Sequence, residues 1–600
     1  MSFVTNLKLK TNFNNDIFYC YFETALHKSN YYVVCYSIYN NKQNILITNS
    51  LIKLKLKTTE DLKRLSLELI SEFLNNCFDI KLNHKLSNPI FIFHNFSYFS
   101  SFFILENLGK HDKYLFKFIN RENTIYKCNV FLKKDPRFFL TFRDSFLLMQ
   151  LPLEKFLLLF KITKKFKTFT FDTNLFLNKK NTFNELENTS INNVKLFQEV
   201  FDAYKTCISN MFNINLLDNL SLSSLSMDIF RLNFYNKEKY PIEILKGTKE
   251  IYVRSSYMGG ITDIYKPTLI NGYHYDINSL YPYIMMNFDM PVGKGEILTD
   301  GNTINLDNFF GFLDVSVIYL SLKKQSDYPC LPVYDPNKGL ISPKGIWRGI
   351  YFSEELKYAK KQGYIFKIHS GIKFKQGKVF HEFIKVMYEM RLKYKKTPLE
   401  GIIKLILNSL YGRFAMQSTD FCTTILDIKD ETTLNSLLFF HEIKSIQYLT
   451  DKIIVKHNSN PSIEKLNQLK KDNYIDSHTY NLQLSKMNKS NFFNVAIQLA
   501  SSITSYARIE MHKYKVNQNY NVFYSDTDSL FTDKPLPDSI VSEKDIGKFR
   551  LEGKVKEAFF VAPKLYSVLY EDGRKLIKAK GINKGKVDEQ DIKDLLFSTK

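Results

Sequence analysis

The first third of the chain carries two hydrophobic periodicities. Residues 17–48 alternate aromatic and β-branched residues with polar ones, which is the period-two pattern of paired strands. Residues 60–77 carry apolar side chains at helical spacing, and 90–94 form a short apolar run typical of a strand. Residues 142–145 are predicted as a strand that leads into a helix, and 185–208 as a further helix. This succession predicts a mixed α/β layer.

The second half of the chain is predicted to be more interrupted. A polar passage at 209–225 precedes Tyr257-Met258-Gly259-Gly260, whose paired glycines permit an unusual backbone conformation or a close approach to a partner. An ordinary interdomain turn is the alternative for this segment. Alternating strands and turns at 300–375 predict an inserted α+β module, and 378–416 is predicted to be helical. Residues 417–490 are polar, rich in Lys and Asn and weakly patterned, which is typical of an insertion.

Composition adds a basic balance to this pattern. The 600 residues are 44% hydrophobic and 15% aromatic, which is enough to bury the cores of several domains. Lys and Arg number 83 against 61 Asp and Glu, and the net charge of +22 favours a polyanion such as nucleic acid as partner. Other basic proteins and membrane-surface binders share this property.

Cysteine spacing and hydropathy exclude several classes of protein. The seven cysteines are scattered and never spaced Cys-x-x-Cys, so neither a zinc site nor a disulfide framework is predicted. A reducing compartment is the simplest interpretation. No uninterrupted run of about 18 apolar residues occurs, which argues against a membrane-spanning segment. The first residues resemble neither a signal peptide nor a transit peptide.

Two carboxylates lie one residue apart in the segment Tyr524-Ser525-Asp526-Thr527-Asp528-Ser529-Leu530. In a hairpin, residues i and i+2 share a face, so Asp526 and Asp528 point the same way. Like charges this close repel each other unless a cation lies between them, which makes the segment a candidate divalent-metal site. An acidic turn that bonds its own backbone is the alternative, and this segment alone does not decide between them.

Two other segments have the chemistry of phosphate binding. In Tyr275-Asp276-Ile277-Asn278-Ser279-Leu280-Tyr281-Pro282, a strand ends in a carboxylate and a tight turn, whose N–H groups can hold a triphosphate while the Asp holds its metal. In the helix predicted over 378–416, Arg391 and Lys395 are spaced i, i+4, and so are Lys404 and Asn408. A solvated basic face is the commoner meaning of any single pair of this kind.

Basic and aromatic residues gather again after the acidic pair. Such clusters suit a groove for a nucleic-acid backbone. They are Gly547-Lys548-Phe549, Lys564-Leu565-Tyr566 and Lys578-Ala579-Lys580-Gly581.

Three of these segments, taken in order, resemble motifs A, B and C of family B DNA polymerases. They are Asp276-x-x-Ser279-Leu280-Tyr281-Pro282, Lys404-x-x-x-Asn408-Ser409-Leu410-Tyr411-Gly412 and Asp526-Thr527-Asp528-Ser529. Three further elements resemble those of the protein-primed members found in phages, adenoviruses and linear plasmids: Tyr257-x-Gly259-Gly260, Thr504-x-x-Ala507-Arg508 and Lys564-x-Tyr566. The resemblance covers about 20–590 and is strongest from 250 onward. It implies a multidomain α/β and α+β protein, with an RNase H-like exonuclease-type domain before a right-hand polymerase domain of palm, fingers and thumb.

The resemblance also implies a role for each acid. Asp276 and Asp528 would hold two Mg²⁺ ions, for which Mn²⁺ can substitute, and Asp526 would contribute to the same site less directly. Lys404 completes the expected catalytic set.

The residues expected to bind the nucleotide surround this acidic site. Lys404, Arg391 and Lys395 would grip the triphosphate, and the backbone of Ser279 and Leu280 would meet its oxygens. Tyr281 would lie beneath the sugar and exclude a 2′-hydroxyl, while Asn408 and Tyr411 would pack at the nascent pair. The residues expected to contact DNA are Tyr257, Gly259, Gly260, Thr504, Arg508, Lys564, Tyr566 and Lys580.

The exonuclease-type motifs depart from the family pattern. Tyr21 stands where the Asp of Asp-x-Glu-Thr belongs, and only Glu23 of that motif remains as a carboxylate. Ser100 and Asn193 occupy further Asp positions. We therefore predict a folded but catalytically inactive exonuclease-type domain.

Two nearby acids are wrongly placed to substitute for the missing ones. Asp16 lies seven residues before Glu23, which puts it on the opposite strand face, and Asp202 lies half a helical rotation from Asn193. The inactive domain is still expected to contact single-stranded DNA through Asn95 and Ser145.

The resemblance and the pattern together divide the chain into eight segments. These are an exonuclease-like domain (1–225), a linker with the Tyr-x-Gly-Gly element (226–262), palm with motif A (263–299), insertion 1 for contact with the priming protein (300–375), fingers with motif B (376–416), palm and insertion 2 (417–490), palm with motif C (491–562), and a short or truncated thumb (563–600).

The implied function is DNA-templated DNA synthesis, with protein-primed replication of a linear element. The expected partners are template and primer DNA, dNTPs and a separate terminal protein, with no membrane and with the chain as a monomer. The expected location is the mitochondrion, as the product of an organellar plasmid or genome, with the cytoplasm or a virus as alternatives. A decayed, non-catalytic nucleic-acid-binding relic is the alternative function. A reverse transcriptase, which typically carries adjacent Asp-Asp in its hairpin, is a third.

Overall fold

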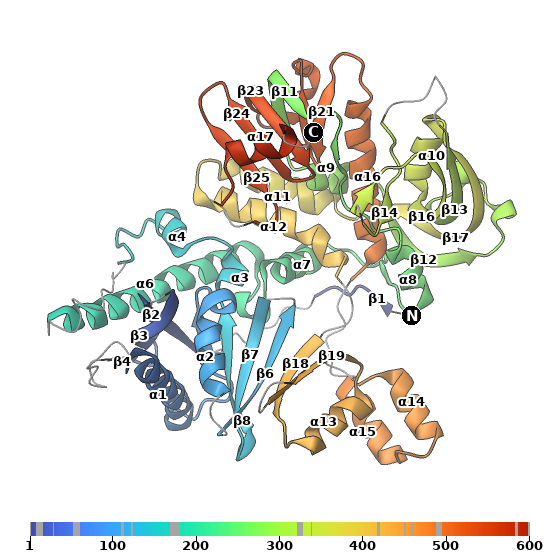
Figure 1. Cartoon of the computed structure of the whole chain (residues 1–600). Coiled ribbons are helices and arrows are strands. Elements are labelled where there is room, and N and C mark those ends of the chain that lie inside the picture. The colour runs from blue at the N-terminus through green and yellow to red at the C-terminus, as the bar shows by residue number, and fades with distance from the viewer. Residues whose placement is uncertain are drawn as a thin grey trace.

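The computed structural model of the protein describes residues 2–7, 16–27, 29–51, 61–109, 113–121, 124–167, 181–320, 328–337, 339–416, 421–448, 452–458, 461–487, 495–582 and 586–597. Two large sheets, each covered by helices, lie one below the other in Figure 1. A four-stranded sheet lies beside the upper one. The mixture of sheets and helices confirms the predicted multidomain α/β and α+β class.

The lower sheet has ten strands in the order β19-β20-β18-β6-β7-β8-β5-β2-β3-β4. β5 pairs in parallel with β2 and β8, and the other neighbours pair antiparallel. The strands from the N-terminal part of the chain are β2 (Ile17–His27), β3 (Asn30–Asn40), β4 (Ile45–Ser50), β5 (Ile90–Phe93), β6 (Tyr114–Arg121), β7 (Thr124–Leu132) and β8 (Asp135–Asp144).

Helices cover both faces of this sheet, which explains the alternating pattern of β2. Phe18 and Phe22 are buried in the core that also contains residues of α1, whereas the Tyr19 ring packs against Phe197 of α6, with 5.3 Å between ring centroids. Successive β2 side chains thus serve two separate cores. The helices of this domain are α1 (Asp61–Asn83), α2 (Ser101–Leu108), α3 (Phe146–Met149), α4 (Leu153–Leu159) and α6 (Asn181–Phe212), which confirm the helices predicted at 60–77 and 185–208.

The upper sheet has seven strands in the order β10-β21-β22-β11-β23-β24-β25, all paired antiparallel. The segment predicted as thumb continues this sheet through β24 and β25, and α17 packs on β23. The elements are β10 (Thr262–Ile264), β11 (Thr268–Ile277), β21 (Val522–Asp526), β22 (Ser529–Thr532), β23 (Phe549–Ala562), β24 (Leu565–Tyr570), β25 (Lys575–Ala579) and α17 (Glu589–Phe597).

One helix is central to this half of the molecule. α16 (Ile497–Lys515) is buried along almost its whole length, and it contacts α8, α9, α10 and α12. A helix enclosed in this way needs partners on every face, which fits its small residues such as Ala500, Ser501 and Ser505. Its neighbours α8 (Thr248–Arg254) and α9 (Leu280–Asn287) precede it in the chain, as does α7 (Leu222–Asn233), which packs on α12.

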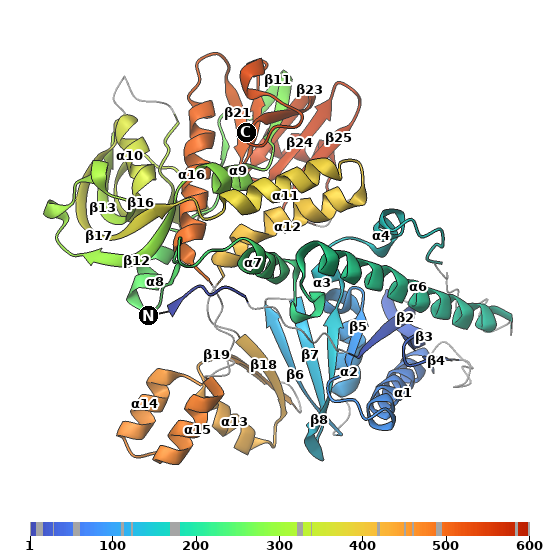
Figure 2. The same ribbon diagram turned by 180° about the vertical axis from the view of Figure 1, so that it is seen from behind.

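The helix predicted over 378–416 is two helices, which corrects that prediction. α11 (His381–Lys393) and α12 (Pro398–Phe414) pack on each other and lie between the upper, seven-stranded sheet and α7 (Figure 2). Thr397 has extended backbone angles, φ −103° and ψ 155°, because the ring of Pro398 disfavours a helical conformation in the residue before it. The chain therefore turns back on itself at this point.

Insertion 1 forms a separate four-stranded antiparallel sheet in the order β12-β17-β13-β16. Its strands begin before and end after the predicted 300–375. Its elements are β12 (Met290–Leu298), β13 (Gly311–Tyr319), β16 (Gly345–Phe352), α10 (Ser353–Lys361), β17 (Ile365–Gly377) and the small hairpin β14 (Val333–Asp335) and β15 (Gly339–Ile341).

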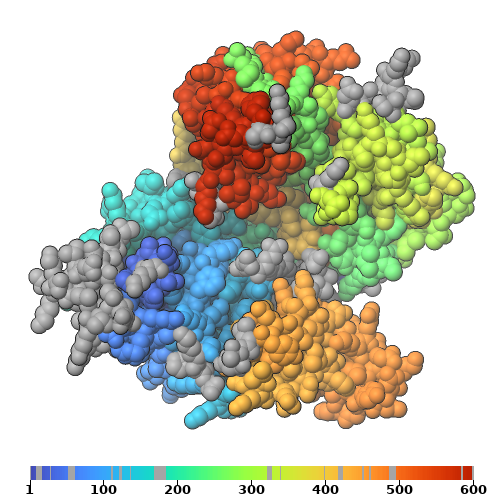
Figure 3. Space-filling view, in the orientation of Figure 1, coloured from blue at the N-terminus to red at the C-terminus, as the bar shows by residue number. Residues whose placement is uncertain are grey.

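Insertion 2 extends the ten-stranded sheet of the N-terminal domain. Thr423 in β18 pairs with Phe118 in β6, and its hydroxyl donates to the Asn120 side chain at 2.8 Å. The space-filling view shows this insertion beside the N-terminal lobe (Figure 3). Its elements are β18 (Phe421–Asp427), α13 (Glu431–Phe440), β19 (Ile443–Tyr448), β20 (Lys452–Asn458), α14 (Ile463–Lys471) and α15 (Ser477–Met487).

A further strand pair joins the start of the described chain to the second half, since β1 (Ser2–Phe3) pairs with β9 (Glu243–Ile244). Within the described residues, every helix is too short or too polar to cross a membrane.

Candidate active site

The upper sheet brings the three predicted acids together. Asp276 is the penultimate residue of β11 and lies opposite Ser529 of β22, and the Ile277 N–H donates to the Asp528 carbonyl at 2.8 Å. Asp526 ends β21, directly before the turn that leads into β22. Segments 250 residues apart in sequence therefore meet on neighbouring strands, as the sequence predicted.

Both chain segments that carry the acids are held in an unusual backbone conformation. Thr527 has φ +53° and Ser279 has φ +54°, values in the left-handed region that non-glycine residues seldom adopt. The Asp528 N–H donates to the Asp526 carbonyl at 2.6 Å, so the turn closes tightly on itself. Such conformations persist only where neighbouring structure enforces them, and they concentrate at functional sites.

Burial and mutual repulsion disfavour ionisation of two of the acids. Burial and the charge of Asp528 raise the pKa of Asp276 to about 7, and Lys404 offsets part of this rise. Burial and the charge of Asp526 raise the pKa of Asp528 to about 6. Two partly buried carboxylates that resist losing their protons near neutral pH favour a divalent cation, since it would remove the repulsion between them.

Asp526 differs from the other two because a protein cation already neutralises it. The Lys564 ammonium lies 2.6 Å and 2.7 Å from its two carboxylate oxygens, and the Thr262 hydroxyl donates to it at 2.9 Å. Across the described residues, no group of three or more His, Cys, Asp or Glu is arranged to hold a metal ion. In the described part of the chain, Asp276 and Asp528 form no such ion pair, and a metal-ligand role for Asp526 stays a prediction.

The α11–α12 pair brings basic residues to this site. Arg391 on α11 donates to the Ser279 hydroxyl at 3.4 Å and forms an ion pair with Glu400 of α12 at 3.5 Å. Lys404 and Asn408 lie on the exposed face of α12, and the charge of Lys404 reaches Asp276. Sequence analysis missed Glu400, and no motif signals it, because its partner lies on another helix.

Two tyrosines from different motifs stack beside the acids. The rings of Tyr281 and Tyr411 have centroids 4.3 Å apart and planes inclined by 32°. Leu280 is buried beneath them in the core shared by α9 and α12. The structure thus joins the predicted nucleotide-binding residues of α9 and α12 in one place.

Lys395 does not belong to this basic helix face. α11 ends at Lys393, and Lys395 lies exposed in the turn before α12. The prediction that Lys395 shares a helix face with Arg391 is therefore wrong, because the helix ends before Lys395 and a new one begins at Pro398.

Several residues predicted to touch DNA are buried in this structure. Thr504 and Arg508 are 1% and 4% exposed within α16, Tyr566 is 5% exposed in an aromatic cluster with Tyr524, and Ser145 is fully buried against His94. Such side chains offer little surface to a DNA strand, so we revise their role to support of the fold. Tyr257, Gly259, Gly260, Lys564, Lys580 and Asn95 keep some exposure, and DNA contact stays a prediction for them.

Among the motif positions of the exonuclease-type domain, which are Tyr21, Glu23, Ser100 and Asn193, Glu23 is the one carboxylate. The Asn193 amide donates to Glu23 at 3.1 Å and is also held by the backbone of Lys167. Burial raises the pKa of Glu23 to about 7 and also raises the pKa of Tyr21. Ser100, in a π-helical turn over Phe96–Ser100, is buried and brings no charge. These residues offer one carboxylate to a metal ion.

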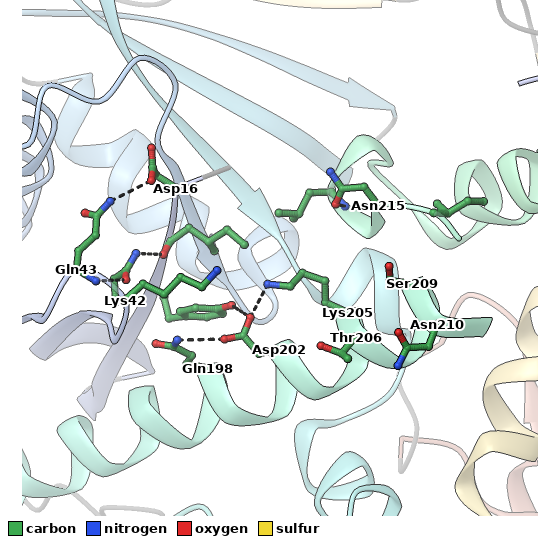
Figure 4. Close-up of a pocket in the computed structure, with 15 residues that line it drawn as sticks. Asp16, Lys42, Gln43, Gln198, Asp202, Lys205, Thr206, Ser209, Asn210 and Asn215 are labelled. Carbon is green, nitrogen blue, oxygen red and sulfur yellow. Dashed lines mark hydrogen bonds and ion pairs between the residues drawn. The ribbon is translucent and has the colours of Figure 1, made fainter. Parts of the chain in front are cut away.

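The two acids that might have replaced the missing ones lie elsewhere. Both line a pocket of about 260 Å³, in which Asp202 accepts hydrogen bonds from Tyr19 and Gln198 and pairs with Lys205, while Asp16 accepts from Gln43 (Figure 4). Asp202 is nine residues beyond Asn193 on α6, or about 13 Å along the helix. Neither acid can therefore complete a site at Glu23.

The fold and the acidic site together define a right-hand polymerase, preceded by an exonuclease-type domain. The family of DNA polymerases type B, organellar and viral, has a profile that matches residues 157–520, and the chain belongs to this family.

Two fungal relatives support this assignment. The chain is 31% identical over 413 residues to a probable DNA polymerase of Podospora anserina, covering 67% of this chain and 33% of that protein. It is 29% identical over 635 residues to a probable DNA polymerase of Ascobolus immersus, covering 96% of this chain and 48% of that protein. The chain thus spans between a third and a half of the length of these curated relatives.

A solved structure shows the same fold. The polymerase of phi29, determined with primer-template DNA and incoming nucleotide substrates, superposes with a TM-score of 0.68 at 17% sequence identity, covering 97% of this chain and 95% of that one. This likeness confirms the predicted order of an exonuclease-type domain before a right-hand polymerase domain.

Proposed function

We propose that this chain is a DNA-templated DNA polymerase that adds deoxynucleotides to a 3′-hydroxyl. The observation that carries the proposal is the meeting of Asp276 on β11 with Asp528 in the turn before the neighbouring β22, close enough to α12 for the charge of Lys404 to act on Asp276. The family membership and the relatives named DNA polymerase support the same activity.

The proposed cofactor is Mg²⁺, with Mn²⁺ as a substitute. Asp276 and Asp528 fit a divalent cation because both are partly buried carboxylates, whose pKa values are raised first by burial and then by neighbouring negative charge. They would hold the metal, and Asp526 would remain paired with Lys564. When bound, two such ions supply the positive charge that lowers the pKa of the 3′-hydroxyl and neutralises the triphosphate.

Residues of the fingers and of the turn after β11 would bind the nucleotide. Lys404, whose charge acts on Asp276, and Arg391, which donates to Ser279, would hold triphosphate oxygens and stabilise charge that moves to the leaving group. The neighbouring Tyr281 and Tyr411 rings, whose planes are inclined by 32°, would supply aromatic surface for the sugar and base. A 2′-hydroxyl would meet the Tyr281 ring, so deoxynucleotides are the proposed substrates.

We further propose that the exonuclease-type domain is inactive. Hydrolysis by two metal ions needs several carboxylates, and burial raises the pKa of Glu23 to about 7, although the hydrogen bond from Asn193 offsets part of this rise. The exposed Asn95 remains available to a single strand of DNA.

The wider setting of the activity is proposed from the family and from the sequence. Priming by the hydroxyl of a separate terminal protein, replication of a linear element and residence in the mitochondrion form one consistent proposal. Insertion 1 is the proposed contact for the priming protein.

Primer extension tests the activity directly. The purified wild-type chain and Asp528→Ala are incubated with a primed template, Mg²⁺ and each dNTP, and 3′-end trimming of a mismatched primer is scored on the same gel. We expect extension by the wild type, none by the variant, and trimming by neither. Equal extension by both proteins would overturn the polymerase assignment, and Mg²⁺-dependent trimming would overturn the inactive exonuclease.

A further inference from the structure

The guanidinium of Arg508 is occupied by contacts within the protein, so it is not available to a DNA phosphate. Its side chain is 2% exposed, and its Nε and one Nη form a two-point ion pair with the Glu355 carboxylate at 2.6 Å and 2.8 Å. The other Nη donates to the carbonyls of Met258 and Gly259, the latter at 3.0 Å. Every nitrogen of the guanidinium is therefore engaged by protein groups.

These contacts join three separate parts of the molecule. Arg508 lies on α16, Glu355 lies on α10 of insertion 1 and is 2% exposed, and Met258 and Gly259 belong to the Tyr-x-Gly-Gly loop. A buried, planar fork of this kind fixes both the distance and the orientation of its partners.

The loop held by Arg508 supports the turn between the catalytic acids. At Gly260, a β-carbon would lie 2.9 Å from the Thr527 Cα, so the loop and the turn are already in closest contact. The next residue, Ile261, accepts a hydrogen bond from the Thr527 N–H at 3.2 Å, and the Thr262 hydroxyl donates to Asp526. The loop thus braces Thr527 in its left-handed conformation.

We propose that Glu355 and Arg508 are positioning residues for the Asp526–Asp528 turn, acting through the loop at 258–262. The pair sets the placement of Asp528 relative to Asp276, and it makes this placement depend on insertion 1. The inference rests on the proposed polymerase function and adds two residues that touch neither DNA nor nucleotide.

Three variants interrupt this connection at different points. Arg508→Lys keeps the charge but loses the two-point geometry. Glu355→Gln keeps the shape and removes the charge. Gly260→Ala leaves the ion pair intact and forces the loop away from Thr527. This variant therefore tests the positioning role even if a change at the buried ion pair prevents folding.

The matched control is Tyr358→Phe. The Tyr358 hydroxyl of α10 bonds the His512 ring of α16 at 2.9 Å, so it joins the same two helices without touching the loop. A merely structural role for the α10–α16 contact would make this variant behave like Glu355→Gln.

The readouts are Mn²⁺ binding and kinetics. Mn²⁺ affinity is measured by EPR titration of the protein with primer-template DNA, and the signal lost in Asp528→Ala defines the site. We expect the three variants to weaken this site by about 10-fold to 100-fold and to lower kcat by a similar factor. For Arg508→Lys and Glu355→Gln, the Kd for primer-template DNA should stay within about twofold of wild type. Tyr358→Phe should match wild type in Mn²⁺ affinity, kcat and Kd.

The outcomes separate this inference from the proposed function. Wild-type Mn²⁺ affinity and kcat in folded Glu355→Gln and Gly260→Ala would overturn the inference while leaving the polymerase intact. A loss confined to DNA affinity would return Arg508 to the DNA-binding role predicted from sequence, and would also overturn it. An inactive wild type that binds no Mn²⁺ at Asp528 would instead overturn the proposed function.

Discussion

The three palm carboxylates differ in what balances their charge. Asp526 pairs with Lys564, whereas Asp276 and Asp528 have raised pKa values, and the charge of Asp528 contributes to the rise at Asp276. A carboxylate that is neutralised by the protein gains little from a metal ion, and one that is repelled by its neighbour gains much. The family resemblance already implies a less direct role for Asp526, and the ion pair with Lys564 supplies a physical reason for it.

This difference predicts unequal effects of amide substitution. Asp528→Asn should lower the rate of nucleotide addition by about 1,000-fold or more, because it removes a proposed metal ligand. Asp526→Asn should lower it by about tenfold or less, because Lys564 and Thr262 can still bond the amide oxygen. Single-turnover insertion rates check this, and equal losses for the two variants would show that Asp526 is a ligand after all.

Unlike Asp526, Glu23 is a buried acid that no cation neutralises among the contacts described for it. Its folded pKa of about 7 lies above the value of about 4.3 in an unfolded chain. The ionised form is therefore disfavoured by folding, so Glu23 costs stability above about pH 7. The cost fades as the pH falls from 7 towards 4, and it is absent below the unfolded pKa.

Glu23→Gln should remove this cost. At pH 8 the variant should be more stable than wild type by about 1–3 kcal/mol, since Gln can still accept from Asn193. At pH 4.5 the two should have the same free energy of unfolding. Denaturant unfolding at both pH values, with EDTA present, measures this. A variant less stable than wild type at pH 8 would mean that the Glu23 carboxylate is well solvated or bound to a cation.

The pairing of β18 with β6 is a contact between elements that the sequence pattern did not predict. It belongs to insertion 2 yet pairs with β6, with Cys422, Thr423 and Thr424 opposite Ile119, Phe118 and Lys117. Each strand within 417–490 is so short that its run of alternating polar and apolar residues cannot be distinguished from a loop. Pairing between segments 300 residues apart is set by the tertiary fold, which local propensity does not report.

Thr423→Pro should detach this strand from β6. Proline lacks the N–H group for the ladder and clashes within a central strand. Hydrogen exchange of the β6 amides at 117–119 should become at least about tenfold faster, while the α1 amides stay protected. Thr423→Ala is the control, because it removes only the hydroxyl bond to Asn120. Unchanged protection in the proline variant would show that β18 does not stabilise β6.

Elements with strong periodicity could be predicted, and those ended by local chemistry could not. The helices α1 and α6 were visible because apolar residues recur along their whole length. The break between α11 and α12 was missed, although Pro398 is in the sequence, because the apolar period continues across it. A proline before a periodic segment signals a helix start, and this signal would have found the boundary.

At the scale of the whole molecule, the acids of the site could be predicted from the sequence, but the residues that hold them in place could not. Motif spacing brings Asp276, Lys404 and Asp528 together, and the structure agrees. The roles of Arg508 and Glu355 depend on burial and on partners from remote segments, so the motif containing Arg508 was taken for a DNA contact. A lone Glu within the buried face of α10 was the available signal, since a buried acid needs a cation.

The two halves of the molecule share one hydrophobic core, which includes Phe197 of α6, Leu407 of α12 and Leu499 of α16. Positive charge is distributed less evenly: residues 417–490 contain nine Lys and nine Asp or Glu, for a net charge of zero against +22 for the chain. Attraction of DNA therefore belongs to the remainder of the molecule.

The most direct test of the central claim is a double-mutant cycle on Asp276 and Asp528. Single-nucleotide insertion rates are measured for wild type, Asp276→Asn, Asp528→Asn and the double variant, at saturating Mg²⁺ and dNTP. If both acids serve one cation site, each single change should cost about 1,000-fold and the double variant should lose no more than about tenfold beyond either. Losses that multiply, or a wild-type rate in Asp276→Asn, would contradict the account.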